Sequence, residues 1–236
     1  MGVSHILDHP QWQALTTEHA RFARRIGDAV AYPAEVSAMS GLANPDDIAA
    51  WRDLAELLGP ESFAILIFSR QPPLPDFVRP LARRGLLQMA GPVEPPVLPP
   101  EPDGLVRLGP ADGPEMVALA KRTEPGPMLA RTVDMGDSWG VRREGVLVAM
   151  AGERLRLTGW TEVSGVCTDP EFRGQGLARY LVARLVRDML ARDERAFLHC
   201  ELGNASAIVL YETLGFTRRA EVALTVASFA DSPLSS

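Results

Sequence analysis

A glycine-rich loop in the second half of the chain has residues suited to binding an anion. It reads Arg173-Gly174-Gln175-Gly176-Leu177-Ala178 and lies between a strand-like segment and the start of a helical pattern. Its two glycines let the backbone turn so that successive amides point into one concavity, where the helix dipole adds positive potential. A phosphate or pyrophosphate could be held there. A plain turn before a helix explains the same residues equally well, because short glycine motifs are common by chance.

Two other phosphate-binding motifs fit this loop less well. A Walker A loop requires Gly-Lys-Ser/Thr, which the segment lacks, and the Rossmann fingerprint has a third glycine where this chain has Arg179. Five residues also separate Thr168 from Gly174. A nicotinamide-dependent oxidoreductase would rest on the glycine pair and on Glu201, which ends the following strand near the place of a ribose-binding acid.

The segments that must position the loop alternate between strand and helix. Residues 161–168 have the pattern of a strand, and residues 177–192 that of a helix with apolar positions at 177, 181, 185 and 189. A strand over 196–202 and a helix over 204–214 follow, and Gly215 closes the helix. This alternation predicts an α/β fold with a mixed sheet.

Further elements are expected before and after these segments. They are a strand over 105–108, a helix over 113–122 stopped by Pro125-Gly126-Pro127, strands over 139–143 and 146–154 joined at Glu144-Gly145, and one or two strands over 216–229.

Prolines interrupt the chain over residues 91–104, where neither helix nor sheet can continue. We therefore predict a smaller N-terminal α/β region over 1–90, a semi-rigid linker over 91–103 and a second domain over 104–236. The first region should contain a helix over 45–58 with Asn44 as its N-cap, strands over 62–68 and 85–90, and a candidate helix over 11–25.

The composition restricts the partners. The 236 residues are 46% hydrophobic and 23% charged, as in globular proteins, and the net charge is −6. Such a charge disfavours nucleic acid and anionic membranes as main partners. Only two cysteines and no signal-peptide pattern indicate a reducing cytoplasm. The longest apolar run, residues 63–68, is too short to span a membrane.

The loop and its flanks together resemble the GNAT superfamily of acyl-CoA-dependent N-acyltransferases. The family signature Arg/Gln-x-x-Gly-x-Gly/Ala is matched by Arg173, Gly176 and Ala178. The preceding TEVSGVCTDPEF and the later GNASAIVLYETLGF are similar to the segments that flank this signature in the family. The resemblance covers about residues 104–229, and the first hundred residues could be a degenerate copy of the same fold.

The resemblance implies a binding site for acetyl-CoA as co-substrate, without a metal. Its pyrophosphate would lie on the backbone of the signature loop, and its pantetheine arm would pair with the end of the strand before the loop. The implied cofactor-binding residues are Val166, Cys167, Thr168, Arg173, Gly174, Gln175, Gly176, Leu177, Ala178, Arg179 and Asn204. Cys167 is expected to pack rather than act as a nucleophile, and Asn204 is equally well explained as a helix N-cap.

The resemblance also implies catalytic roles. Tyr211, seven residues after Asn204 on the same helix face, would protonate the departing thiolate. The amine must lose its proton to a base or to a chain of water molecules. Glu162 would be this base, although a solvated glutamate at a strand end is equally plausible. His199 could relay a proton or be a buried, hydrogen-bonded residue, and Glu201 could steer an amine or simply end the strand.

These expectations define an N-acetyltransferase that moves an acetyl group from acetyl-CoA to a primary amine by direct attack in a ternary complex. The alternative is a non-catalytic acyl-CoA-binding sensor or interaction module. The sequence does not identify the acceptor, because acceptor specificity depends on loops such as 123–137. A homodimer is a further expectation, since exposed final strands often pair between subunits.

Overall fold

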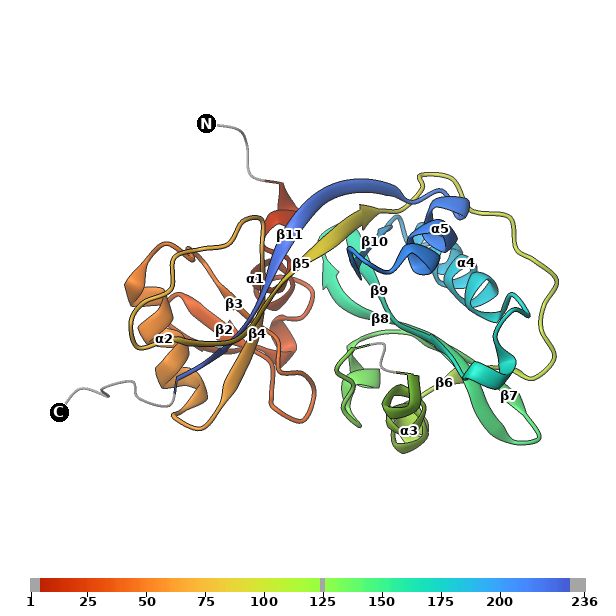
Figure 1. Ribbon diagram of the computed structural model, residues 1–236, viewed down its shortest axis with the longest axis horizontal. Helices are drawn as coiled ribbons and strands as arrows, with labels where there is room; N and C mark the ends of the chain where they lie inside the picture. The colour runs from red at the N-terminus through yellow and green to blue at the C-terminus, as the bar shows by residue number, and fades with distance from the viewer. Residues whose placement is uncertain (1–4, 124–125, 230–236) are drawn as a thin grey trace. The chain divides into compact units, whose positions relative to one another are not determined.

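The computed structural model describes residues 5–123 and 126–229, and its contacts group the chain into two compact units (Figure 1). Unit 1 comprises residues 1–34, 38–87 and 220–236, and unit 2 comprises residues 35–37 and 88–219. This grouping differs from the division expected from the sequence, because the end of the last strand belongs to unit 1 and residues 91–103 belong to unit 2.

Unit 1 is a small α/β unit with an apolar core. Its elements are α1 (Pro10–Thr16), β1 (Arg24–Ile26), β2 (Ala29–Ala31), β3 (Ser40–Leu42), α2 (Ile48–Leu58) and β4 (Phe63–Phe68). Strands β1, β2 and β3 form an antiparallel sheet, while β4 pairs with residues 223–228 near the chain end. Trp51 and Leu54 of α2 pack with Leu66 and Phe68 of β4 in the core.

Two helix boundaries in unit 1 differ from the predictions. Helix α2 begins at Ile48, with Asp47 as N-cap accepting from the Ala49 amide at 2.9 Å, because Asn44 instead accepts from the Asp46 amide at 3.1 Å. The candidate helix over 11–25 ends at Thr16, and residues 24–26 form β1.

Unit 2 contains a mixed sheet with helices on both faces. Its elements are the end of β5 (Arg79–Ala90), β6 (Leu105–Leu108), α3 (Gly113–Thr123), β7 (Ser138–Arg143), β8 (Val146–Leu157), β9 (Trp160–Thr168), α4 (Leu177–Leu190), β10 (Arg195–Glu201), α5 (Ala205–Thr213) and the start of β11 (Thr217–Ser228). The strand order is β11-β5-β10-β9-β8-β7-β6. Figure 1 shows α3 on one face of this sheet and α4 and α5 on the other.

The chain direction in this sheet confirms the predicted fold class. Strands β6 to β9 form an antiparallel meander, and β10 then pairs parallel to β9 after crossing over through α4. The β7–β8 turn falls at Glu144-Gly145, as predicted, and both residues have positive φ (50° and 84°), which suits a tight hairpin. Such a sheet is not the parallel arrangement that a Rossmann dinucleotide site requires.

Residues 91–103 contain no helix or strand, but they are attached to α4. The Tyr180 hydroxyl donates to Glu101 Oε2 at 3.0 Å, and Arg187 Nη1 donates to the Pro96 carbonyl at 3.2 Å. The segment predicted as a semi-rigid linker therefore lies along α4.

We expect the apolar face of α4 to be a main source of stability. Leu181 is fully buried, so Leu181→Ala should lower the free energy of unfolding by about 2–5 kcal/mol in urea titrations. Val209→Ala removes methyl groups from a side chain that is 58% exposed on α5, and it should change this quantity by less than about 0.5 kcal/mol. Equal effects of the two substitutions would contradict this assignment of the core.

Candidate functional site

The loop before α4 presents backbone amides that have no partner. Gly174 and Gly176 have φ of 76° and 75°, and Gly176 is the N-cap of α4 without any side-chain cap. The Tyr180 amide donates to the Gly176 carbonyl at 3.0 Å, but among the described residues the amides of 174–179 have no recorded acceptor. A Cβ atom at either glycine would meet nothing within 4 Å. The glycines are thus required by backbone conformation, and the concavity is open to a ligand.

Strands β9 and β10 part immediately before this loop. Their paired residues are Trp160 with Arg195, Thr161 with Ala196, and Glu162 with Phe197. Beyond these pairs β9 continues to Thr168 and β10 to Glu201. Because the pairing stops while both strands go on, the β10-facing edge of β9 is available to an extended ligand over its last residues.

The last residues of β9 include a cysteine that packs in the core and a threonine hydroxyl without a hydrogen-bond partner among the described residues. The Cys167 side chain is 7% exposed and packs in the core cluster below α3; burial raises the pKa of its thiol to about 11. The thiol is therefore protonated at neutral pH, which favours the packing role over a nucleophile. The buried Thr168 Oγ1 has no hydrogen-bond partner among the described residues, so it can serve a ligand at the strand end.

Tyr211 and Asn204 lie on α5 and at its N-terminus. Tyr211 is 8% exposed and packs against Phe216, and burial raises the pKa of its phenol above the ordinary value. Asn204 is the N-cap, since its Oδ1 accepts from the Ala207 amide at 3.2 Å. The N-cap interpretation of Asn204 is thereby confirmed, and its cofactor contact stays a prediction.

Glu162 lies in a row of polar side chains that crosses five adjacent strands on unit 2. Arg154 of β8 donates from Nε and Nη2 to the two Glu162 oxygens at 2.8 and 2.7 Å, and His199 Nδ1 lies 2.7 Å from Glu162 Oε1. His199 Nε2 lies 2.9 Å from Gln88 Nε2, and Arg219 donates to Gln88 Oε1 at 2.6 Å. The Gln88 and Glu162 side chains have no exposed area, and that of His199 is 2% exposed.

These contacts determine the state of each group in the row. The Gln88 amide nitrogen can only donate, so His199 Nε2 accepts and Nδ1 carries the proton given to Glu162. Burial alone would raise the pKa of Glu162, but Arg154 and His199 outweigh it and hold this pKa at about 2. The solvated-glutamate interpretation is wrong, and His199 is the buried, hydrogen-bonded residue that the sequence allowed.

Sequence reasoning missed Arg154, Gln88 and Arg219. Gln88 is a single polar residue in an apolar segment, whereas Arg154 and Arg219 each lie beside other charged residues. Nothing local indicates which strands become neighbours. The available signal was a polar residue inside an otherwise apolar strand, such as Gln88 in GLLQMA.

Of the remaining predicted residues, Leu177 is buried and Val166 and Ala178 are half-buried, while four others lie at the surface of the site. Arg173, Gln175, Arg179 and Glu201 are exposed, and Arg173 Nε donates to the Thr168 carbonyl at 3.3 Å. Arg173 thus connects the loop to the end of β9, which keeps the two parts of the candidate binding surface together.

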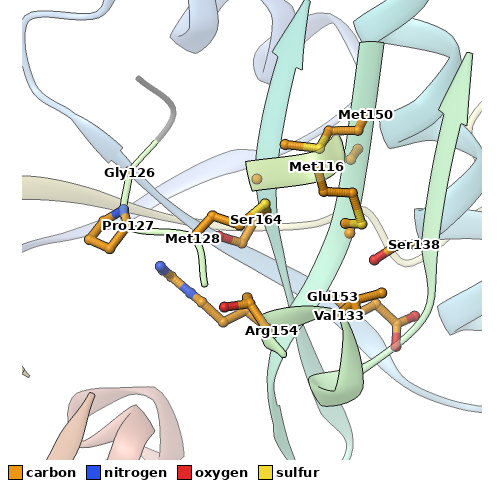
Figure 2. Close-up of a pocket in the computed structure, with 14 residues that line it drawn as sticks. Met116, Gly126, Pro127, Met128, Val133, Ser138, Met150, Glu153, Arg154 and Ser164 are labelled. Carbon is orange, nitrogen blue, oxygen red and sulfur yellow. The ribbon is translucent and has the colours of Figure 1, made fainter. Parts of the chain in front are cut away.

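A small pocket lies on the α3 side of β8 and β9, close to the point where β9 and β10 part (Figure 2). Its lining includes Met116 of α3, Met128, Met150 and Arg154 of β8, and Ser164 of β9. Figure 2 shows the three methionine side chains reaching toward the same space. The loop over 123–137 contributes to this pocket through residues 126–128 and 132–133, while residues 124–125 lie outside the described part of the chain.

Comparison with known proteins places this geometry in a family. The profile of the FR47-like protein family matches residues 138–224. A protein from Novosphingobium aromaticivorans, assigned to the GNAT acetyltransferases and solved as a crystal structure, is 38% identical in sequence to this chain. The two structures match with a TM-score of 0.86, over 96% of this chain and 99% of that one. A GCN5-related N-acetyltransferase from Kribbella flavida shares the fold at 19% identity, with a TM-score of 0.65 over 97% and 96% of the two chains. No curated protein matches the sequence.

The mixed sheet, the parting strands and the signature loop define an acyltransferase. The chain belongs to the GNAT family, so the resemblance inferred from the sequence is confirmed. Among residues 5–123 and 126–229, no helix is long and apolar enough to cross a membrane.

The Glu162 environment predicts a specific dependence of stability on pH. The folded-state pKa of about 2 lies below the value of about 4.5 for an unperturbed glutamate, so the Arg154–Glu162 pair stabilises the fold above pH 4.5 and loses this effect as pH falls toward 2. Glu162→Gln leaves Arg154 without its counter-charge and should cost about 3–5 kcal/mol at pH 7.

The measurement is the free energy of unfolding at several pH values. The difference between wild type and Glu162→Gln should shrink from pH 5 to pH 2.5. Glu61→Gln, at an exposed turn, should behave as wild type throughout. A difference that did not vary with pH would show that Glu162 is not the low-pKa partner of Arg154.

Proposed function

We propose that the protein is an N-acetyltransferase that moves the acetyl group of acetyl-CoA to a primary amine by direct attack in a ternary complex. The observation that carries this proposal is the run of partnerless amides at 174–179 at the N-terminus of α4, in a chain of the GNAT family. These amides suit a pyrophosphate, and Arg173 and Arg179 add positive charge beside them.

The strand edge beyond Glu162 fits the remainder of the cofactor. Val166, Cys167 and Thr168 would hold the pantetheine arm through their backbone, and the Thr168 hydroxyl would gain the partner it lacks. Acetyl-CoA supplies an activated thioester, and a backbone amide of β9 is suited to stabilise the oxyanion. Binding both reactants in one cleft removes much of the entropic barrier to their reaction.

Tyr211 is the proposed acid. Its buried phenol stays protonated at neutral pH, because burial raises its pKa. The same burial disfavours the phenolate and makes the phenol a weaker acid. In this proposal the hydroxyl therefore hydrogen-bonds the developing thiolate and gives it the proton only as the carbon–sulfur bond breaks.

The amine must also lose a proton, and Glu162 is poorly placed to take it. Both of its oxygens are occupied by Arg154 and His199, and a carboxylate with a pKa of about 2 is a weak base. In this proposal water therefore removes the proton from the amine. Glu162 is a positioning residue that holds Arg154 and His199 in place. The cytoplasmic location and the homodimer remain predictions from the sequence.

The first experiment is calorimetric titration of the full chain with acetyl-CoA, with NADH as control. Acetyl-CoA should bind and NADH should not, because the sheet lacks the Rossmann arrangement. Tight binding of NADH alone would contradict the proposal. Binding of acetyl-CoA without turnover of any amine would indicate the non-catalytic acyl-CoA-binding protein instead.

The loop can be tested with matched glycine substitutions. Gly176→Val places a branched side chain at positive φ beside the amides, and the dissociation constant for acetyl-CoA should rise at least about tenfold, or 1.4 kcal/mol. Gly145→Val makes the same change at φ 84° in the β7–β8 turn, also in open space, so it controls for backbone strain and should leave the dissociation constant unchanged. Equal binding by both variants would remove the loop from the site.

Tyr211 can be tested by removing its hydroxyl. Tyr211→Phe should lower kcat about 10²-fold, the lower range for general acid catalysis, with no change in the dissociation constant of acetyl-CoA. Tyr180, on α4, bonds to Glu101 through its hydroxyl. Tyr180→Phe removes this hydroxyl and should leave kcat near that of wild type. Unchanged turnover in Tyr211→Phe would exclude Tyr211 as the acid.

A further inference from the structure

The pocket in Figure 2 is lined mainly by apolar side chains. Its apolar surface comes mainly from three methionines, Met116, Met128 and Met150, together with Pro127 and Val133. Met116 and Met150 are 3% and 1% exposed and belong to the core cluster, so they form a preformed floor, while the half-buried Met128 lies over it. Methionine side chains adapt to apolar groups of different shape.

Among the pocket-lining residues that the structure describes, Glu153 and Arg154 are the charged ones, and each lies against groups of opposite charge. Arg192 Nη2 donates to Glu153 Oε1 at 2.7 Å, and Arg154 is held by both oxygens of Glu162. Arg154 and Glu162 balance each other, because the pKa of Glu162 is held at about 2. Burial raises the pKa of Glu153, and Arg192 opposes this shift. Arg192 also contacts Asp137 and Glu194, which in turn contact Arg107 and Arg156, so this cluster has as many arginines as carboxylates. A charged group entering the pocket would therefore lose its hydration without meeting an opposing net charge.

The pocket is also close to the place where an acceptor would react. Ser164 and Gly165 line it, and the next residue of β9 is Val166, the first of the proposed pantetheine contacts. A Cβ atom on Gly165 would lie 3.0 Å from Met128 Cε, so the backbone of β9 directly adjoins the methionine surface. A molecule with its side group in the pocket would hold its amine near the β9 edge.

We propose that this pocket takes an uncharged, apolar side group of the acceptor, so that the substrate class is a primary amine with an apolar substituent. This inference rests on the proposed function, because it assigns the second substrate of the same site. Amines with a second cation or with a carboxylate on the same side group are excluded by the cost of burying an uncompensated charge.

Three amines with the same five-carbon chain test the assignment. Pentylamine, 1,5-diaminopentane and 5-aminopentanoate carry the same reacting amine and end in a methyl group, a cation or an anion. With acetyl-CoA saturating, kcat/KM for pentylamine should exceed both others at least tenfold. A preference for either charged amine would overturn the proposal.

Charge substitutions at Met128 provide a reciprocal test. Met128→Glu should reverse the preference toward 1,5-diaminopentane, and Met128→Lys should reverse it toward 5-aminopentanoate. Leu129→Glu introduces the same charge at a neighbouring residue that is 38% exposed and does not line the pocket, so it should retain the wild-type order. An unchanged order in both Met128 variants would place the acceptor elsewhere.

A binding measurement separates this inference from the proposed function. In protein labelled with [methyl-13C]methionine, pentylamine should shift the methyl signals of Met116, Met128 and Met150, and leave those of Met39, Met89 and Met189 in place. If these shifts appear while acetyl-CoA fails to bind, the proposed function is wrong and the pocket assignment stands. If acetyl-CoA binds and the three signals do not move with pentylamine, the pocket assignment is wrong.

Discussion

The early end of the pairing between β9 and β10 is the constraint on which the candidate site depends. A strand that leaves its neighbour exposes amide and carbonyl groups that need partners. On this chain the open edge begins after Glu162 and leads toward a loop whose amides are also without acceptors. Two sets of unsatisfied backbone donors thus meet along one path, and a long, partly peptide-like ligand with a phosphate group would satisfy both.

The buried polar row stabilises the point of separation. Arg154, Glu162, His199 and Gln88 come from four adjacent strands, and their contacts hold these strands together just before β9 and β10 part. Apolar residues there would pack against any neighbour, whereas a half-buried guanidinium and a buried carboxylate and imidazole require particular hydrogen-bond partners. The row therefore fixes the register of the sheet where the backbone alone no longer does so.

Much of the fold could be predicted from the sequence because its signals are local. The 177–190 helix, the loop glycines and the Glu144-Gly145 turn each follow from periodicity or backbone conformation within a few residues. The ion pair between Arg154 and Glu162 could not be predicted in this way, since it depends on which strands become neighbours. The shift of the α2 N-cap from Asn44 to Asp47 had a different cause, namely two residues of equal capping ability three positions apart.

Strand β11 has a consequence for how this chain can have evolved. Residues 223–228 pair with β4 in unit 1, although the family resemblance that begins near residue 104 runs through them. A recombination event that moved residues 104–229 into another gene would take a strand away from unit 1 and leave β4 with an exposed edge. Exchange of the C-terminal part alone would therefore leave unit 1 incomplete, so we expect the two units to be exchanged only together.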